Sequence, residues 1–153
     1  MLDIQLGKNM IIDGDIVSDV VFDEEKNVSF KLRYVDKDEL NELTDKRTKT
    51  TFNQKTHQRE DKTDYKKLKE DICKASVLGW KGVTLSWIKS LNPRFDVSGY
   101  KKKQLNEEIA FSQENLLFVI DQSYSGIDAW IIDNIKEPKN FEEIETLEED
   151  VKN

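Results

Sequence analysis

The chain has 153 residues, close to the usual size of one domain, and it carries a net charge of −7 with 36% charged residues. This acidic balance argues against the broad basic surface that supplies most nonspecific affinity for nucleic acid. The single cysteine, Cys73, excludes an internal disulfide, and the one histidine leaves no ligand set for zinc. No apolar run approaches the roughly 18 residues of a membrane span and no secretory leader pattern is visible, so we expect a cytoplasmic protein.

The first 35 residues are rich in strand-forming side chains. β-Branched and aromatic residues dominate 15–22 and 28–35, which predicts two strands. In the second strand, apolar side chains occupy every other position, at Val28, Phe30, Leu32 and Tyr34. This alternation indicates one buried and one wet face. The polar residues 23–27 have the length and chemistry of a hairpin turn, and residues 4–6 and 10–12 are candidates for a smaller pair of strands.

A short helix is predicted after the strands. Asp36 stands at the N-cap position, and Glu39 follows at the spacing of a capping box. Leu40 and Leu43 give this helix an apolar side, and we expect it to end near Thr44.

A polar, basic stretch comes next. Residues 44–67 contain no aliphatic side chain and hold eight Lys or Arg against four Asp or Glu. We therefore expect residues 44–63 to form a flexible basic loop, or a segment that orders only on a partner. The 17 residues from 137 onward hold seven acids and two lysines, so residues 137–153 are predicted to be an acidic, disordered tail beyond a single domain of residues 1–136.

Three further helices follow from capping and spacing. One begins after Asp64 and places apolar residues at helical spacing up to Leu78, with Gly79 as its C-cap. A second is predicted over residues 113–122, capped by Ser112, and a third after Asp128, stopped before residue 138. The fold class is therefore α+β: N-terminal antiparallel hairpins followed by a small helical subdomain.

Patterns typical of catalysis or cofactor binding are absent from the sequence. His57 lies in the polar stretch with no predicted neighbour to orient it, and Cys73 borders an apolar stripe without an activating partner. Asp13-Gly14-Asp15 lacks the other ligands of a calcium loop and is better explained as a turn. We expect no enzyme activity, no metal site and no cofactor.

The segment between the second and third predicted helices has no clear helix or strand pattern, but it contains several aromatic side chains. Trp87, Phe95 and Tyr100 lie between the predicted helices. They either cover the core or anchor a partner, because aromatic residues on loops are common interface anchors. We name these three residues as the candidate partner-binding site.

Two short motifs resemble a known family. The segments Val77-Leu78-Gly79-Trp80-Lys81-Gly82-Val83 and Ile109-Ala110-Phe111-Ser112-Gln113-Glu114-Asn115-Leu116-Leu117 are similar to small proteins encoded in the tail-gene clusters of tailed phages and prophages. Those proteins are described as tail-assembly chaperones or minor tail-associated proteins. The resemblance implies a binding module without catalytic residues, whose partners are other tail or virion proteins in the host cytoplasm or in the virion.

Two alternatives stay open at this point. The first is a structural virion subunit, such as a tail terminator or head–tail connector, which would assemble into a symmetric ring. The second is a nucleic-acid-binding accessory protein that uses the basic stretch, in which Phe52 and Tyr65 stand among the cations. The acidic balance of the whole chain makes nucleic acid the less favoured partner.

Overall fold

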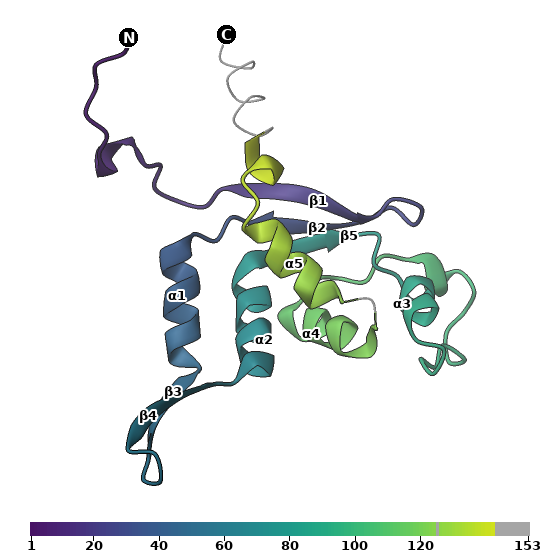
Figure 1. The fold of residues 1–153 in the computed structure, drawn as a ribbon. Coiled ribbons are helices and arrows are strands. Elements are labelled where there is room, and N and C mark those ends of the chain that lie inside the picture. The colour runs from purple at the N-terminus through teal and green to yellow at the C-terminus, as the bar shows by residue number, and fades with distance from the viewer. Residues whose placement is uncertain (125, 143–153) are drawn as a thin grey trace.

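A small antiparallel sheet lies on one side of the molecule and the helices lie on the other (Figure 1). The computed structural model describes residues 1–124 and 126–142. The sheet consists of β1 (Val17–Asp23), β2 (Val28–Arg33) and β5 (Val77–Lys81) in the order β1-β2-β5. An N-terminal antiparallel hairpin followed by helices confirms the predicted α+β class.

The alternation in β2 decides which side of the sheet faces the core. Val28, Phe30 and Leu32 have no exposed surface, whereas Lys31 between them is exposed. Tyr34 follows the end of the strand and is only half-buried. The predicted turn is also present: the backbone N–H of Lys26 donates to Asp23 at 3.1 Å, and β1 pairs antiparallel with β2.

The N-terminal residues do not form the smaller pair of strands that the sequence suggested. Residues 1–16 contain only a short 3-10 turn, Lys8–Met10. Leu2, Leu6 and Ile11 are exposed, and Figure 1 shows this segment leading away from the sheet. Eight of these 16 residues are apolar, but no described strand pairs with the segment to cover them.

Five α-helices follow in the part of the chain that the structure describes, and three of the predicted caps are confirmed. They are α1 (Lys37–Lys46), α2 (Tyr65–Ser76), α3 (Leu85–Leu91), α4 (Gln113–Gln122) and α5 (Ile127–Ile135). The side chains of Asp36, Asp64 and Ser112 each accept the backbone N–H three residues on, at 2.9, 3.2 and 3.0 Å. Such caps satisfy N–H groups that have no partner within the helix.

Two predicted helix ends are wrong. Helix α2 ends at Ser76 rather than at Gly79, because the next residues pair with β2, with Trp80 opposite Phe30 and Gly79 opposite Lys31. Asp128 does not cap the last helix, which begins after Gly126 at φ 65°. At the end of α2, the pairing with β2 overrides the local preference for helix.

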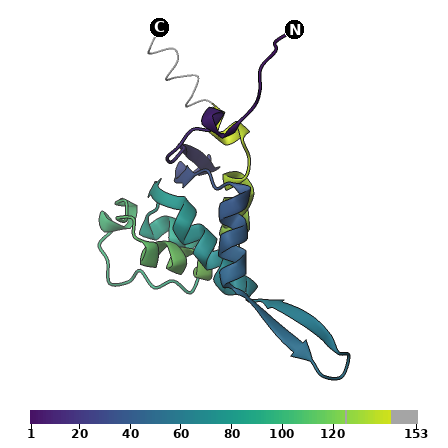
Figure 2. The same cartoon turned by 90° about the vertical axis from the view of Figure 1, so that its left-hand side faces the viewer.

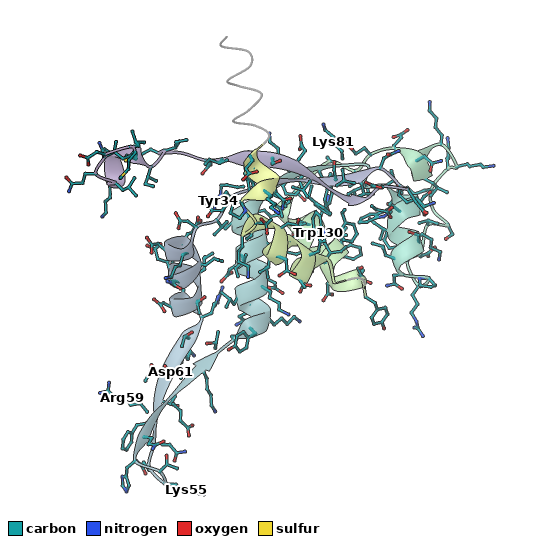
Figure 3. The ribbon with its side chains drawn as sticks, turned by 45° about the horizontal axis from the view of Figure 1, so that its top comes forward. Tyr34, Lys55, Arg59, Asp61, Lys81 and Trp130 are labelled. Carbon is teal, nitrogen blue, oxygen red and sulfur yellow. The ribbon has the colours of Figure 1, made fainter. Side chains whose placement is uncertain are left out.

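Residues 44–63, predicted to be a flexible loop, form the end of α1 and a regular hairpin. Strands β3 (Thr48–Asn53) and β4 (Gln58–Thr63) pair along their whole length. The hairpin projects beyond the helices, and Lys55, Arg59 and Asp61 lie away from the body (Figures 2 and 3). Neither strand buries a residue, so the burial pattern that normally identifies a strand is missing.

The hairpin has no core of its own, and hydrogen bonds and one ion pair stabilise it instead. Thr50 donates to Asp61 across the strands at 2.7 Å, and Thr48 and Thr63 share a hydrogen bond of 2.8 Å. At the base, the guanidinium of Arg47 contacts both carboxylate oxygens of Asp71 in α2, at 2.5 and 3.0 Å. The hairpin is thereby anchored to the helical layer.

The hydrophobic core lies between the inner face of the sheet and the helices. It includes Phe30, Ile72, Leu116 and Ile131, and the edge of the Trp130 ring packs on Phe22 beneath the sheet (Figure 3). The core extends past the predicted boundary at residue 136. Phe141 is buried, with its ring 5.4 Å from that of Tyr34, so residues 137–142 belong to the packed body rather than to a disordered tail. Residues 143–153 of the predicted tail lie outside the described residues.

Candidate functional site: an apolar pocket between two sequence motifs

The two motifs that carry the family resemblance contact each other. The indole N–H of Trp80 donates to the carbonyl of Ile109 at 2.7 Å, and the Ile109 N–H donates to the carbonyl of Val83 at 2.8 Å. The Trp80 ring packs edge-on against Phe111 at 5.2 Å. Segments 29 residues apart in the chain are thus joined into one unit.

Gly82 allows this junction to form next to the β1–β2 turn. Its φ is +80°, and a Cβ on it would lie 2.2 Å from the carbonyl oxygen of Asn27. No other residue can approach that backbone so closely without displacing it. The Gly82 N–H also donates to the carboxylate of Glu108 at 2.7 Å, which ties the end of β5 to the segment before α4.

An apolar pocket of about 380 Å³ lies at this junction. Aromatic and aliphatic side chains from β5, α3, α4 and the loops between α3 and α4 line it: Trp80, Leu85, Ile88, Phe95, Ile109, Phe118 and Val119. Polar side chains stand at its rim: Tyr100, Gln104, Glu107, Glu108 and Asn115. An apolar hollow with a polar rim is suited to hold apolar side chains of a ligand.

The structure separates the three residues predicted to bind a partner. Trp87 is 3% exposed and its ring packs against Phe22 at 6.1 Å, so it is a core residue and its prediction as a partner contact is wrong. Helix α3 turns this side chain towards the sheet. Phe95 is half-buried and Tyr100 is 52% exposed, and both line the pocket.

Sequence reasoning missed two aromatic side chains of this site. Trp80 was not among the predicted partner contacts, yet it forms part of the pocket wall. Phe118 in α4 is 45% exposed, with its ring 6.0 Å from that of Phe95. The signal for Phe118 was available, because it falls outside the stripe of Leu116, Val119 and Ile120 that the helix directs inward.

The loop that carries Phe95 has a fixed shape. The ammonium group of Lys89 donates to the carbonyls of Pro93 and Phe95, at 2.5 and 2.8 Å. The amide of Asn92 donates to Gln122 of α4 at 2.9 Å. These bonds tie the loop to both helices that border the pocket.

The histidine and the cysteine of the chain both lie outside this pocket. Cys73 lies in the core, away from the pocket, and burial together with the nearby Asp128 and Glu70 raises the pKa of its thiol to about 12. His57 stands at the hairpin tip beside the ring of Phe52, at 6.3 Å. Among residues 1–124 and 126–142, no three His, Cys, Asp or Glu side chains are grouped as metal ligands. The pocket residues therefore offer apolar contacts and hydrogen bonds.

No protein-family model matches this chain, and no curated protein or solved structure matches it. Within the described part of the chain, no helix is both long enough and apolar enough to cross a membrane.

Proposed function

We propose that this chain is a non-enzymatic binding protein of a tailed phage or prophage that aids tail assembly by holding other virion proteins. The observation that supports the proposal is the contact between the two family-like motifs, which together build an apolar pocket. A resemblance confined to two short segments gains weight when those segments form one surface. The proposed activity is that of a tail-assembly chaperone.

The pocket is suited to apolar side chains from a helix. Its volume is at the lower end of the roughly 300–1,000 Å³ typical of ligand pockets, and its rim includes the exposed rings of Tyr100 and Phe118. Anchor residues one helical turn apart enter such hollows in helix-in-groove recognition. The proposed ligands are apolar helical segments of a tape-measure or tube protein, released when polymerisation buries them.

The experiment is deletion of the gene in a host that produces particles, with mass spectrometry of purified wild-type particles. Loss of tails on deletion, with the protein absent from mature particles, is the expected result. Presence in stoichiometric amount would favour the structural-subunit alternative instead. Normal particles from the deletion strain, without the protein in the wild type, would remove the phage proposal.

A matched pair of variants links this function to the pocket. Phe118→Ser removes an exposed ring from the pocket rim, and Phe52→Ser removes one from the hairpin. We expect only Phe118→Ser to lose capture of the virion partner in a pull-down and to produce defective tails. Equal loss for both variants, or loss for Phe52→Ser alone, would assign the binding surface elsewhere.

The hairpin supports the nucleic-acid alternative to a limited degree. It projects from the body with exposed Lys49, Lys55 and Arg59 and an exposed ring at Phe52, and β-ribbons can enter a DNA groove. Acidic residues interrupt these cations. Binding of duplex DNA that weakens steeply with salt and disappears when Lys49, Lys55 and Arg59 become serine would favour this alternative.

A further inference from the structure

Residues 1–12, here named the arm, expose much of the apolar surface of the molecule. Of the 14 large apolar side chains that are exposed in the described part of the chain, seven belong to the arm: Met1, Leu2, Ile4, Leu6, Met10, Ile11 and Ile12. A monomeric protein rarely exposes so many apolar side chains in one continuous segment. This concentration marks the arm as a segment that packs against another surface.

The first half of the arm has the pattern of a strand with one apolar face. Leu2, Ile4 and Leu6 alternate with Asp3 and Gln5, which is the period of two that burial of one strand face requires. The backbone of residues 2–6 forms no hydrogen bond with any described residue. The arm leads away from β1 of its own chain instead of lying beside it (Figures 1 and 2). Its N–H and C=O groups are therefore available to pair with a strand.

Strand β1 has a free edge of matching length. The sheet order β1-β2-β5 gives β1 no neighbour on its outer side among the described strands. The N–H of Tyr34 donates to the carbonyl of Ile16 at 2.8 Å, and hydrogen-bonded pairs alternate along an antiparallel ladder. The residues whose N–H and C=O groups point away from β2 are therefore Val17, Asp19 and Val21.

The core beneath this edge is not fully covered. Val20 lies opposite Phe30 in the ladder, so its side chain is on the core side of the sheet. Ile16, Val20 and Phe22 pack against the core but are only half-buried, whereas Phe30 of β2 has no exposed surface. A further strand beside β1, with its apolar face towards the core, would cover these side chains.

We propose that residues 2–6 of one copy pair with the β1 edge of a second copy, with Leu2, Ile4 and Leu6 on the core side. In this mode of recognition, backbone hydrogen bonds supply affinity and the alternating side chains supply specificity. Exchange of arms in both directions closes a two-fold dimer. The pocket residue Trp80 lies in β5, at the opposite edge of the sheet. The inference therefore goes beyond the proposed function and does not depend on it.

Three variants of the full chain test the two halves of this contact. Ile4→Glu places a charge on the apolar face of the arm, and Gln5→Glu is the matched control that places the same charge on the polar face. Asp19→Pro removes an outward N–H from the β1 edge without removing a hydrogen bond to β2. Sedimentation equilibrium measures association, and circular dichroism checks that each variant keeps the wild-type fold. If Asp19→Pro does not fold, the comparison of Ile4→Glu with Gln5→Glu still decides.

The wild type and Gln5→Glu should dimerise reversibly at concentrations up to about 0.1 mM. Ile4→Glu should raise the dissociation constant about tenfold or more, because burial of one isoleucine contributes on this scale. Asp19→Pro should also weaken the dimer. A mixture of Ile4→Glu with Asp19→Pro contains one intact arm and one intact edge, so it should associate more tightly than either variant alone.

Hydrogen exchange of the amides of residues 2–6 distinguishes the second copy from other occupants of the edge. Exchange should be slow in the wild-type dimer and fast in Ile4→Glu. A monomeric wild type overturns the proposal, and slow exchange in that monomer would show that the arm pairs with the edge of its own chain. Equal weakening by Ile4→Glu and Gln5→Glu, or a mixture that associates no better than its components, also overturns it.

Discussion

The hydrogen bond between Trp80 and Ile109 can be tested against a second tryptophan that lacks one. Trp80→Phe keeps an aromatic ring in the pocket wall but removes the donor that joins the two motifs. Trp87→Phe makes the same chemical change at a site where the indole nitrogen is buried and meets no acceptor among the described residues. Both tryptophans are more than nine-tenths buried, so the lost ring area is similar in the two variants.

The difference in free energy of unfolding between Trp80→Phe and Trp87→Phe should be larger than the effect of either hydrogen-bonding change alone. Removing a neutral hydrogen bond costs about 1 kcal/mol net, and more where the acceptor is left without a partner. Removing a buried donor that has no acceptor relieves a desolvation cost of about 1 kcal/mol or more. The common cost of the smaller ring cancels between the variants. Trp80→Phe should therefore be less stable than Trp87→Phe by about 2 kcal/mol.

Urea unfolding followed by far-UV circular dichroism measures this difference. The two midpoints should be clearly separated at an unchanged slope, since a change in slope would signal a change in the surface exposed on unfolding. Equal destabilisation, or greater destabilisation of Trp87→Phe, would refute the role given to the Trp80 hydrogen bond. Phe118 lies on the pocket rim, so Phe118→Ser should leave the free energy of unfolding within about 0.5 kcal/mol of the wild type. This variant therefore separates binding from stability.

Three further predictions concern single sites. The Arg47 guanidinium lowers the pKa of the Asp71 carboxyl from its ordinary 3.8, so the ion pair stabilises the fold above pH 3.8. The stability advantage of the wild type over Asp71→Asn should disappear as pH falls below that value, as measured by urea midpoints across pH. The raised pKa of the Cys73 thiol predicts almost no reaction with a disulfide reagent at pH 8 until the protein unfolds, which absorbance of the released thiolate records. Gly82→Ala should lower stability by about 3 kcal/mol or more, while Gly99→Ala, with open space around it, should be close to neutral in the same urea assay.

Local signals were sufficient where the chain decides its structure over a few residues. The caps at Asp36, Asp64 and Ser112 need only one side chain and a backbone N–H three positions away, and all three are present. A strand was predicted over residues 28–35 because burial of one face leaves a period of two in the sequence, and the observed strand covers Val28–Arg33. Helix α4 was predicted with both of its ends correct.

The wrong predictions occur where contacts with residues distant in sequence determine the local structure. Residues 77–81 read as the end of a helix because Val77 and Leu78 extend the apolar stripe of α2. Their backbone instead pairs with β2, more than 40 residues earlier. The hairpin β3–β4 was not predicted, for a different reason. It has no buried face, so its only sequence signals were the threonines that favour strands.

The pocket also forms from segments that are distant in sequence. Only some of its residues could therefore be predicted from the sequence. Phe95 and Tyr100 were predicted because aromatic side chains on a loop are conspicuous. Trp87 has the same composition signal, but helix α3 directs it into the core. Phe118 lies outside the apolar stripe of α4, and no rule for helix burial accounts for an aromatic ring in that position. Phe118 is therefore the residue that we propose as a contact for a partner, and the Phe118→Ser variant tests it.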